Sequence, residues 1–306
     1  MPTTLERVPK RPTGRVDAVL DTDAYNEIDD QFAIALLLKC PEKVNLRQIY
    51  AAPFFNSRSA SPEDGMEKSY NEILRLLALC GKTQKDIPVF RGSRSYLSAA
   101  DTPVESEAAR ALIAIASEYT ADNPLYVVTI GCVTNVASAL LMAPEIAEKI
   151  VLVSLIGNAY HWEHANAKEF NLWQDLHASR VLFSCDAPFV QLPCMGIVSS
   201  FTTTKPELEY WLSGKNPLAE HLASAAIEEA DSYAEGQAWS RVIWDVTAAA
   251  WLLDPDGRYM KASPRCCMMP TADGTYHEGD GRYCLYVTHI WRDRLMTDLF
   301  RRMLGE

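Results

Sequence analysis

The chain has 306 residues, of which 48% are hydrophobic, and this composition fits a folded globular protein and excludes a disordered or fibrous one. Forty acidic residues against 29 basic ones give a net charge of −11, which argues against a nucleic-acid partner. The longest apolar runs, such as 32–38 and 125–130, are far shorter than the roughly 20 residues that span a bilayer, so we expect no membrane partner.

The first fifteen residues carry four basic side chains but no apolar segment before a small-residue cleavage site, so no secretory signal is visible. We therefore expect a cytoplasmic protein in which residues 1–15 form a loosely ordered N-terminal arm. Eight scattered cysteines, none in a C-x-x-C pair, are expected to be buried, reduced thiols.

Short runs rich in β-branched residues alternate with longer stretches of helical period along the first two thirds of the chain. The predicted strands are 17–20, 46–52, 87–90, 125–130, 150–156 and 188–192. The predicted helices are 31–39, 65–80, 105–119, 135–141 and 175–183. This order predicts an α/β fold with a mostly parallel, doubly wound, Rossmann-like sheet and helices on both faces.

The last third of the chain has a different pattern. Residues 204–237 favour additional helices, and residues 264–288 turn to Gly, Pro and aromatic side chains with a possible hairpin. Arginines near the C-terminus lie on an expected amphipathic helix. Because no internal repeat or long linker interrupts the chain, we expect residues 1–306 to form a single domain.

Five carboxylates lie within ten residues, between the first predicted strand and the first predicted helix. They are Asp21, Asp23, Glu27, Asp29 and Asp30. Like charges this close repel one another unless a cation or a set of hydrogen-bond donors compensates them. An acidic first helical turn, worth roughly 0.3 to 1 kcal/mol for each carboxylate, accounts for Asp29 and Asp30 but not for Asp21 and Asp23. A hard divalent cation such as Ca²⁺, which takes oxygen ligands, accounts for most of them, whereas Zn²⁺ is disfavoured because the cluster holds no His or Cys.

Two other acidic motifs fit this cluster less well. A haloacid-dehalogenase-type phosphatase also has D-x-D after its first strand, but it requires Thr or Val at the position of Tyr25. An EF-hand loop starting at Asp21 requires Gly and Glu at positions that Asn26 and Phe32 occupy. The first interpretation is weakened and the second fails.

The D-x-D…D-D pattern of Asp21, Asp23, Asp29 and Asp30 resembles the metal-binding N-terminus of the inosine-uridine-type nucleoside hydrolases. Further segments follow in the order found in that family. They are Asn56, TIGCVTNVASAL (129–140), GN (157–158), KEFN (168–171), Asp175 and VIWDVTAAAWLLDP (242–255). Each segment alone is a weak signal, but together and in order they make a strong match over 17–255.

The resemblance implies one Ca²⁺ at the floor of a cleft. Its ligands would be Asp23, Asp30, the side chain of Asp245 and the backbone carbonyl of Ile130. A water held there would give its proton to Asp23 and attack C1′ of a ribonucleoside, and the products would be free base and ribose. Members of this family commonly form homodimers or homotetramers.

The resemblance also assigns residues to the ribose. Asp29 and Asn171 would hold the 2′- and 3′-hydroxyls, Asn158 and Glu169 the 5′-hydroxyl, and Asn56 would line the ribose site. Asp21 would support the ligands from behind. For each asparagine taken alone, loop capping and turn formation are the commoner roles, so that alternative stays open.

The sequence departs from the family pattern at two places that could face the nucleobase of the substrate. Five residues, 24–28, separate Asp23 from Asp29 where the family commonly has three including a Gly, so Asn26 or Glu27 is a candidate to point into the site. Trp244 replaces the His that precedes the last metal Asp in many relatives. The leaving base could be activated by stacking on Trp244 or Trp162, for which core packing is the alternative role. It could also receive a proton from His161 or His164, for which exposure on a loop is the alternative.

These departures keep two other functions open. One is a hydrolase of another ribosyl compound, such as a modified nucleoside or a nicotinamide riboside, on the same Ca²⁺ site. The other is a non-catalytic protein that binds a nucleoside or sugar.

Overall fold

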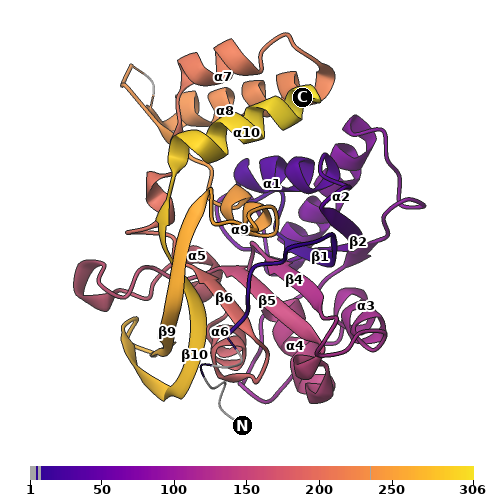
Figure 1. Ribbon diagram of the computed structural model, residues 1–306, viewed down its shortest axis with the longest axis vertical. Helices are drawn as coiled ribbons and strands as arrows, with labels where there is room; N and C mark the ends of the chain where they lie inside the picture. Colours follow the sequence, from indigo (N-terminus) through magenta and orange to yellow (C-terminus); the bar gives the residue numbers. More distant parts are fainter. Residues whose placement is uncertain (1–4, 6–7, 235) are drawn as a thin grey trace.

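An eight-stranded sheet forms the centre of the protein (Figure 1). The computed structural model describes residue 5, residues 8–234 and residues 236–306. The strand order is β3-β2-β1-β4-β5-β6-β10-β9, and every neighbouring pair is parallel except β10 with β9. The strands are β1 (Val16–Thr22), β2 (Val44–Ala51), β3 (Val89–Arg91), β4 (Leu125–Thr129), β5 (Ile150–Leu155), β6 (Phe189–Leu192), β9 (Met260–Pro270) and β10 (Tyr276–Ile290). The prediction of a mostly parallel α/β sheet is confirmed.

Helices cover both faces of this sheet, as the alternating pattern predicts. One face carries α1 (Asp29–Leu38), α2 (Pro62–Leu79) and α9 (Val246–Trp251), and the other carries α3 (Glu107–Ala116), α4 (Thr134–Met142) and α6 (Leu176–Ser184). Adjacent residues of β1 serve different faces, because Leu20 packs in the first of these two cores and Val19 in the second. The doubly wound arrangement is therefore confirmed.

The additional helices expected in the second half are also present. They are α5 (Phe170–Gln174), α7 (Lys205–Trp211), α8 (Pro217–Ala234) and α10 (Arg292–Leu304). Helices α7, α8 and α10 lie together beyond α1 (Figure 1). Short strands β7 (Thr202–Thr203) and β8 (Arg241–Val242) form a separate antiparallel pair, and β8 leads into α9.

The late hairpin is longer than the sequence indicates. Strands β9 and β10 together cover Met260 to Ile290 and pair with a register shift between Glu278 and Tyr283. Strand β10 also pairs in parallel with β6, so the hairpin extends the central sheet. The irregular register accounts for the weak strand pattern in this part of the sequence.

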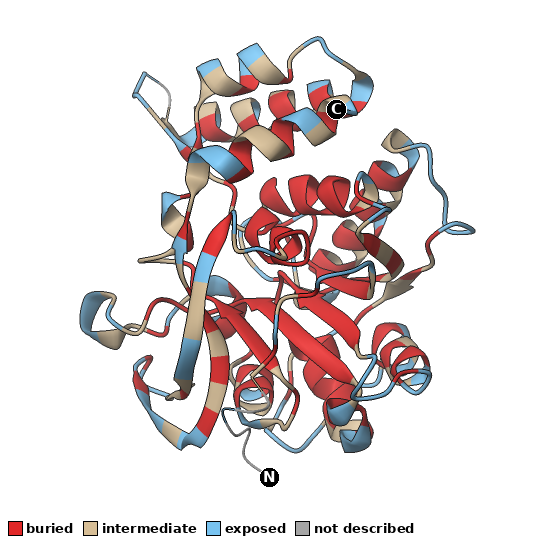
Figure 2. Cartoon of the chain, in the orientation of Figure 1, coloured by how far each residue is buried: buried red, intermediate tan, exposed pale blue. Residues whose placement is uncertain are grey.

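Burial follows this layered arrangement: Figure 2 shows the central strands, α1 and α9 almost wholly buried. All eight cysteines are free thiols, but only five of them are buried, because Cys80, Cys185 and Cys266 are partly exposed. Among the described residues, no helix is long and apolar enough to cross a membrane.

The predicted N-terminal arm, residues 1–15, lies partly outside the described residues. Within its described part, the Arg11 guanidinium donates to the Asp254 carboxylate at 2.8 Å and to the Met260 carbonyl at 2.6 Å. These bonds attach the arm to the connection between α9 and β9.

Candidate active site

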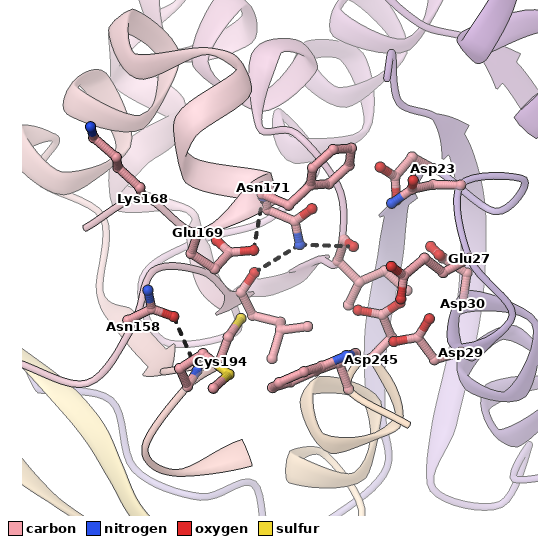
Figure 3. Close-up of a pocket in the computed structure, with 16 residues that line it drawn as sticks. Asp23, Glu27, Asp29, Asp30, Asn158, Lys168, Glu169, Asn171, Cys194 and Asp245 are labelled. Carbon is pink, nitrogen blue, oxygen red and sulfur yellow. Dashed lines mark hydrogen bonds between the residues drawn. The ribbon is translucent and has the colours of Figure 1, made fainter. Parts of the chain in front are cut away.

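Most of the predicted site residues converge where the strand order reverses, between β1 and β4. Asp23 follows β1 and Ile130 follows β4, and the Ile130 N–H donates to the Asp21 carbonyl at 2.9 Å. In open α/β sheets this switch point leaves a crevice beyond the carboxyl ends of the strands. A cavity of about 270 Å³ lies there, and sixteen residues line it (Figure 3).

Gly131 lets the first and fourth strands approach each other at this point. A Cβ atom at Gly131 would lie 2.9 Å from the backbone nitrogen of Asp23 and 3.0 Å from its carboxylate carbon. Any larger residue would therefore displace Asp23. The glycine in the segment 129–140 is thus needed because only a residue without a side chain leaves room for Asp23, the candidate catalytic base.

Three further carboxylates meet Asp23 at the floor of the cavity. Asp29 and Asp30 form the first turn of α1, and Asp245 is the residue that precedes α9. Carboxylate oxygens of these three residues lie within 4.8 Å of one another. Figure 3 shows Asp23, Asp29, Asp30 and Asp245 on the same side of the cavity. Asp23 does not belong to this group of three, although it lines the same cavity.

These carboxylates have few compensating partners within the protein. Both side-chain oxygens of Asp23 and one of Asp29 are buried with no hydrogen-bond partner. Burial, followed by the neighbouring negative charges, raises the pKa of Asp23 and of Asp29 well above the ordinary value. Burial also raises the pKa of Asp30 to about 7, although a hydrogen bond from Thr22 opposes this shift. Unpaired, buried anions with oxygen donors only are the environment that a hard divalent cation such as Ca²⁺ fits.

The opposite wall consists of amide and carboxylate groups held by the backbone. Glu169 precedes α5, and its carboxylate accepts hydrogen bonds from the N–H groups of Gly157, Asn171 and Leu172 at 2.8 to 3.1 Å. Asn158 donates to the Asn166 carbonyl at 3.1 Å and accepts from the backbone of Met195 at 3.1 Å. Both side chains line the cavity in fixed orientations (Figure 3).

Asn171 connects the two walls. Its side-chain nitrogen donates to the carbonyl of Ile130 at 3.2 Å and to the carbonyl of Leu155 at 3.3 Å. The Ile130 carbonyl keeps a second lone pair, so this bond does not exclude it as a ligand. The side-chain oxygen of Asn171 is then free to accept a hydrogen bond from a hydroxyl group.

The longer turn after β1 places both of its polar side chains in the cavity wall. Asn26 and Glu27 line the cavity, as the sequence suggests. The side-chain oxygen of Asn26 accepts from the Asn56 amide at 2.6 Å, and the Glu27 carboxylate pairs with Arg241 at 2.9 Å. Asn56 therefore lies behind Asn26 and does not itself belong to the cavity lining.

The residues proposed for the base side separate into two groups. Trp244 lines the cavity beside Asp245. His161 and His164 are exposed on the turn that contains the 3₁₀ helix Glu163–Ala165, and His161 contributes to a different depression next to Arg265. Trp162 packs against Gly196 outside the cavity lining. Sequence proximity to Asn158 and Glu169 thus did not bring these three residues to the site, because the turn leads away from it.

Asp21 lies behind the site. It is fully buried, outside the cavity lining, and accepts a hydrogen bond from the Asn135 amide at 2.8 Å. Burial raises the pKa of Asp21 to about 7. Asp175 is also buried, and it accepts hydrogen bonds from Thr134 at 2.7 Å and from the backbone of Leu97 at 2.9 Å. Both carboxylates connect the segments that carry the site.

Sequence reasoning missed five residues of the lining: Leu155, Lys168, Phe170, Cys194 and Met195. Cys194 and Met195 closely follow the predicted strand 188–192, so the rule that ligands gather at strand ends contained the signal for them. Lys168 and Phe170 flank Glu169 in the KEFN segment. Arg241 was also missed, because its pairing with Glu27 spans 214 positions of the sequence.

The fold and the site define an α/β protein with a cluster of buried carboxylates at its strand switch point and amide groups placed opposite it. The chain belongs to the family described as inosine-uridine preferring nucleoside hydrolase, whose sequence profile matches residues 18–290. The predicted class of enzyme is confirmed by this match.

Individual relatives agree with the family. The pyrimidine-specific ribonucleoside hydrolase RihA of Enterobacter sp. (strain 638) is 25% identical over 266 residues, covering 78% of this chain and 79% of that protein. RihA of Escherichia coli O139:H28 (strain E24377A / ETEC) is 27% identical over 265 residues, again covering 78% of this chain and 79% of that protein.

Solved structures show the same fold. The purine-preferring ribonucleoside hydrolase from Gardnerella vaginalis superposes with a TM-score of 0.72 at 20% identity, covering 94% of this chain and 98% of that one. The plant nucleoside hydrolase PpNRh1 superposes with a TM-score of 0.73 at 18% identity, covering 96% of this chain and 100% of that one.

Proposed function

We propose that this protein hydrolyses the N-glycosidic bond of ribonucleosides and releases free base and ribose. The observation that carries the proposal is the group of buried carboxylates Asp23, Asp29, Asp30 and Asp245 at one end of a cavity whose other end holds Asn158, Glu169 and Asn171. A divalent cation and the hydroxyls of a ribose are complementary to these two ends. The names of the relatives, ribonucleoside hydrolases, support this assignment.

The residues present fit Ca²⁺. Asp30 and Asp245, whose carboxylate oxygens lie within 4.8 Å of each other and of Asp29, would hold it together with Asp23 and the carbonyl of Ile130, which line the same cavity. When bound, such a cation lowers the pKa of a coordinated water and neutralises part of the negative charge of the site.

The protein's own groups perform the remaining steps. Asp23, whose carboxylate oxygens are buried and unpaired, accepts the proton of the attacking water. The carboxylate of Asp29 and the side-chain oxygen of Asn171 accept hydrogen bonds from the 2′- and 3′-hydroxyls. Asn158 and Glu169 orient the 5′-hydroxyl. The negative charges near C1′ stabilise the oxocarbenium character of the sugar as the bond to the base breaks.

Asp21 and Asn56 support the site from behind in this proposal. Asp21 orients Asn135 and the end of β1, while Asn56 fixes the amide of Asn26. Trp244 provides the surface on which the base rests.

The test is to incubate the purified chain with a panel of ribonucleosides and Ca²⁺ while following the release of reducing sugar. We expect release from at least one ribonucleoside, and we expect Asp23→Ala and Asp245→Ala to abolish it. No release from any of them at high enzyme concentration would refute the proposed activity. Full activity of either variant would refute its assigned role.

Three further features are part of this proposal. Residues 1–306 act as one domain, the enzyme works in the cytoplasm, and it assembles as a homodimer or homotetramer. Light scattering of the purified chain measures the last of these directly.

A further inference from the structure

The cavity walls carry an excess of negative charge. Of the sixteen described residues that line the cavity, six are carboxylates and one, Lys168, is a cation. Figure 3 shows the ammonium group of Lys168 pointing away from the carboxylates, and it lies 5.1 Å from the centre of the Trp173 ring. Outside the lining, Arg241 pairs with Glu27. Even when Arg241 and a bound divalent cation are counted, the carboxylates outnumber the positive charges.

This charge favours a positively charged ligand. Charges enclosed by low-dielectric walls act on a ligand more strongly than charges at an open surface. Four of the six carboxylates, those of Asp23, Asp29, Asp30 and Asp245, are also buried, and both Asp23 and Asp29 have oxygens without a hydrogen-bond partner, so solvent compensates these four little. A substrate that brings a positive charge into the cavity therefore gains energy that a neutral substrate does not.

Two aromatic side chains, Trp244 and Phe170, complete the lining. Trp244 directly precedes Asp245, so an indole lies next to the carboxylate cluster. The face of an aromatic ring attracts cations, and indole does so most strongly. A flat heteroaromatic cation therefore suits this cavity in both shape and charge.

The chemistry of the leaving group leads to the same class of substrate. When the C1′–N bond of a neutral nucleoside breaks, its electron pair makes the base an anion unless a proton is supplied. None of the described residues that line the cavity is a histidine, and His161 and His164 lie elsewhere. A base that already carries a positive charge takes the electron pair and leaves as a neutral molecule. It requires no acid.

We infer that this site, given the proposed hydrolase function on which the inference rests, prefers N-ribosides whose base carries a fixed positive charge. Pyridinium ribosides and N7-alkylated purine ribosides belong to this class. In the reaction, the water oxygen bonds to C1′, its proton passes to Asp23, and the electron pair of the C1′–N bond neutralises the ring nitrogen. The products are ribose, a neutral base and one proton.

Matched substrates test this preference. The purified chain with Ca²⁺ is given 7-methylguanosine and guanosine, which differ by one methyl group and the charge, and nicotinamide riboside with its neutral reduced form. Because charged ribosides also hydrolyse faster without enzyme, each kcat/KM is divided by the uncatalysed rate constant. We expect this ratio to be about tenfold higher for the charged member of each pair, a factor between those of an exposed and a fully desolvated cation–π contact. We also expect only the KM of the charged substrates to rise with ionic strength.

The outcomes separate the inference from the proposed function. Equal or better turnover of the neutral partners overturns the inference and leaves the nucleoside hydrolase function intact. Absence of turnover for all four compounds overturns both.

Variants of Trp244 provide a second test. Trp244→Leu is expected to reduce the kcat/KM of the charged substrate about tenfold more than that of its neutral partner. Trp244→Phe, which keeps an aromatic face, is expected to retain most of the preference for the charged substrate. Trp173→Leu is the control, because Trp173 is a partly exposed indole that does not line the cavity. An equal loss for both substrates in Trp244→Leu would contradict a contact with the cationic base.

Discussion

The guanidinium of Arg241 lies 2.9 Å from the carboxylate of Glu27 and holds the turn after β1 against β8. Arg241 is only 8% exposed, and it also contacts Glu229 at 3.3 Å and the hydroxyl of Tyr233 at 3.2 Å. The positive charge of Arg241 counters the rise in the pKa of the neighbouring Asp29. The Glu27–Arg241 pair thus stabilises the longer turn after β1, and Arg241 also favours the ionised form of Asp29 in the cavity wall.

Removing Arg241 should therefore destabilise the folded protein. We expect Arg241→Met to lower the free energy of unfolding by about 2 kcal/mol, because it leaves Glu27 without its partner beside other carboxylates. Urea denaturation measures this change. The double variant Glu27→Gln/Arg241→Met should lose less free energy of unfolding than the sum of the losses in the two single variants.

As a control, Arg58→Gln, which removes the more exposed contact between Arg58 and Glu229 at 3.5 Å, should change the free energy of unfolding by less than about 1 kcal/mol. Strict additivity of the double variant would show that the pair is not coupled.

Ca²⁺ should stabilise the protein through the carboxylate cluster. At a free Ca²⁺ concentration about 100 times the Kd, the free energy of unfolding should rise by about 2.7 kcal/mol. Asp245→Asn should abolish this gain, yet it should make the chelated protein at least as stable as the unaltered chain, because it removes one buried negative charge. Thermal unfolding with Ca²⁺ and with chelator measures both effects. Asp122→Asn, at an exposed position, is the control and should respond to Ca²⁺ like the unaltered protein. An undiminished response in Asp245→Asn would remove Asp245 from the ligands.

The pH dependence of the chelated protein should be opposite to that of a protein stabilised by ionised carboxylates. Burial raises the pKa of Asp21 and of Asp30 from 3.8 to about 7. Between pH 3.8 and about pH 7, Asp21 and Asp30 bind more protons in the folded state than in the unfolded state. The contribution of these two groups to the free energy of unfolding is therefore present at low pH and is lost as the pH rises through about 7. We expect the Tm with chelator to fall between about pH 5 and about pH 8, and to fall less with Ca²⁺, since a cation favours the ionised carboxylates. A rise in the Tm of the chelated protein over this range would contradict the account.

Gly131 should be essential for the position of Asp23. Its Cβ position lies 3.0 Å from the Asp23 carboxylate carbon, so Gly131→Ala must displace the candidate base. A displacement of this kind typically costs about 100-fold in rate, and we expect a fall in kcat/KM of this order. Gly14→Ala is the control, since no atom lies within 4 Å of its Cβ position, and its activity should be unchanged. Full activity of Gly131→Ala would show that Asp23 tolerates the shift.

Much of the fold follows from the sequence because the strands are buried on both faces. Runs such as 125–130 and 150–156 are apolar except for Thr129 and Ser154, which is typical of parallel strands covered by helices. All six predicted strands are present with small differences at their ends. The hairpin β9–β10 was harder to define, because half-exposed residues and a register shift replace the regular pattern there.

The arrangement of the site was predictable where residues follow a strand or precede a helix. Asp23, Asn158 and Asp245 follow this rule, and all three line the cavity. The rule fails for His161 and Trp162, which lie in a long connection whose direction local sequence does not determine. It also gives no information about pairs such as Glu27 with Arg241, since that contact depends on how α8 and β8 pack against the turn after β1.

A crystal structure of the chain with Ca²⁺ and ribose bound tests the assignment of the site most directly. We expect a cation among Asp23, Asp30, Asp245 and the carbonyl of Ile130, with the sugar's 2′- and 3′-hydroxyls on Asp29 and Asn171. Ribose bound away from these residues, or carboxylates that hold no cation at saturating Ca²⁺, would contradict it.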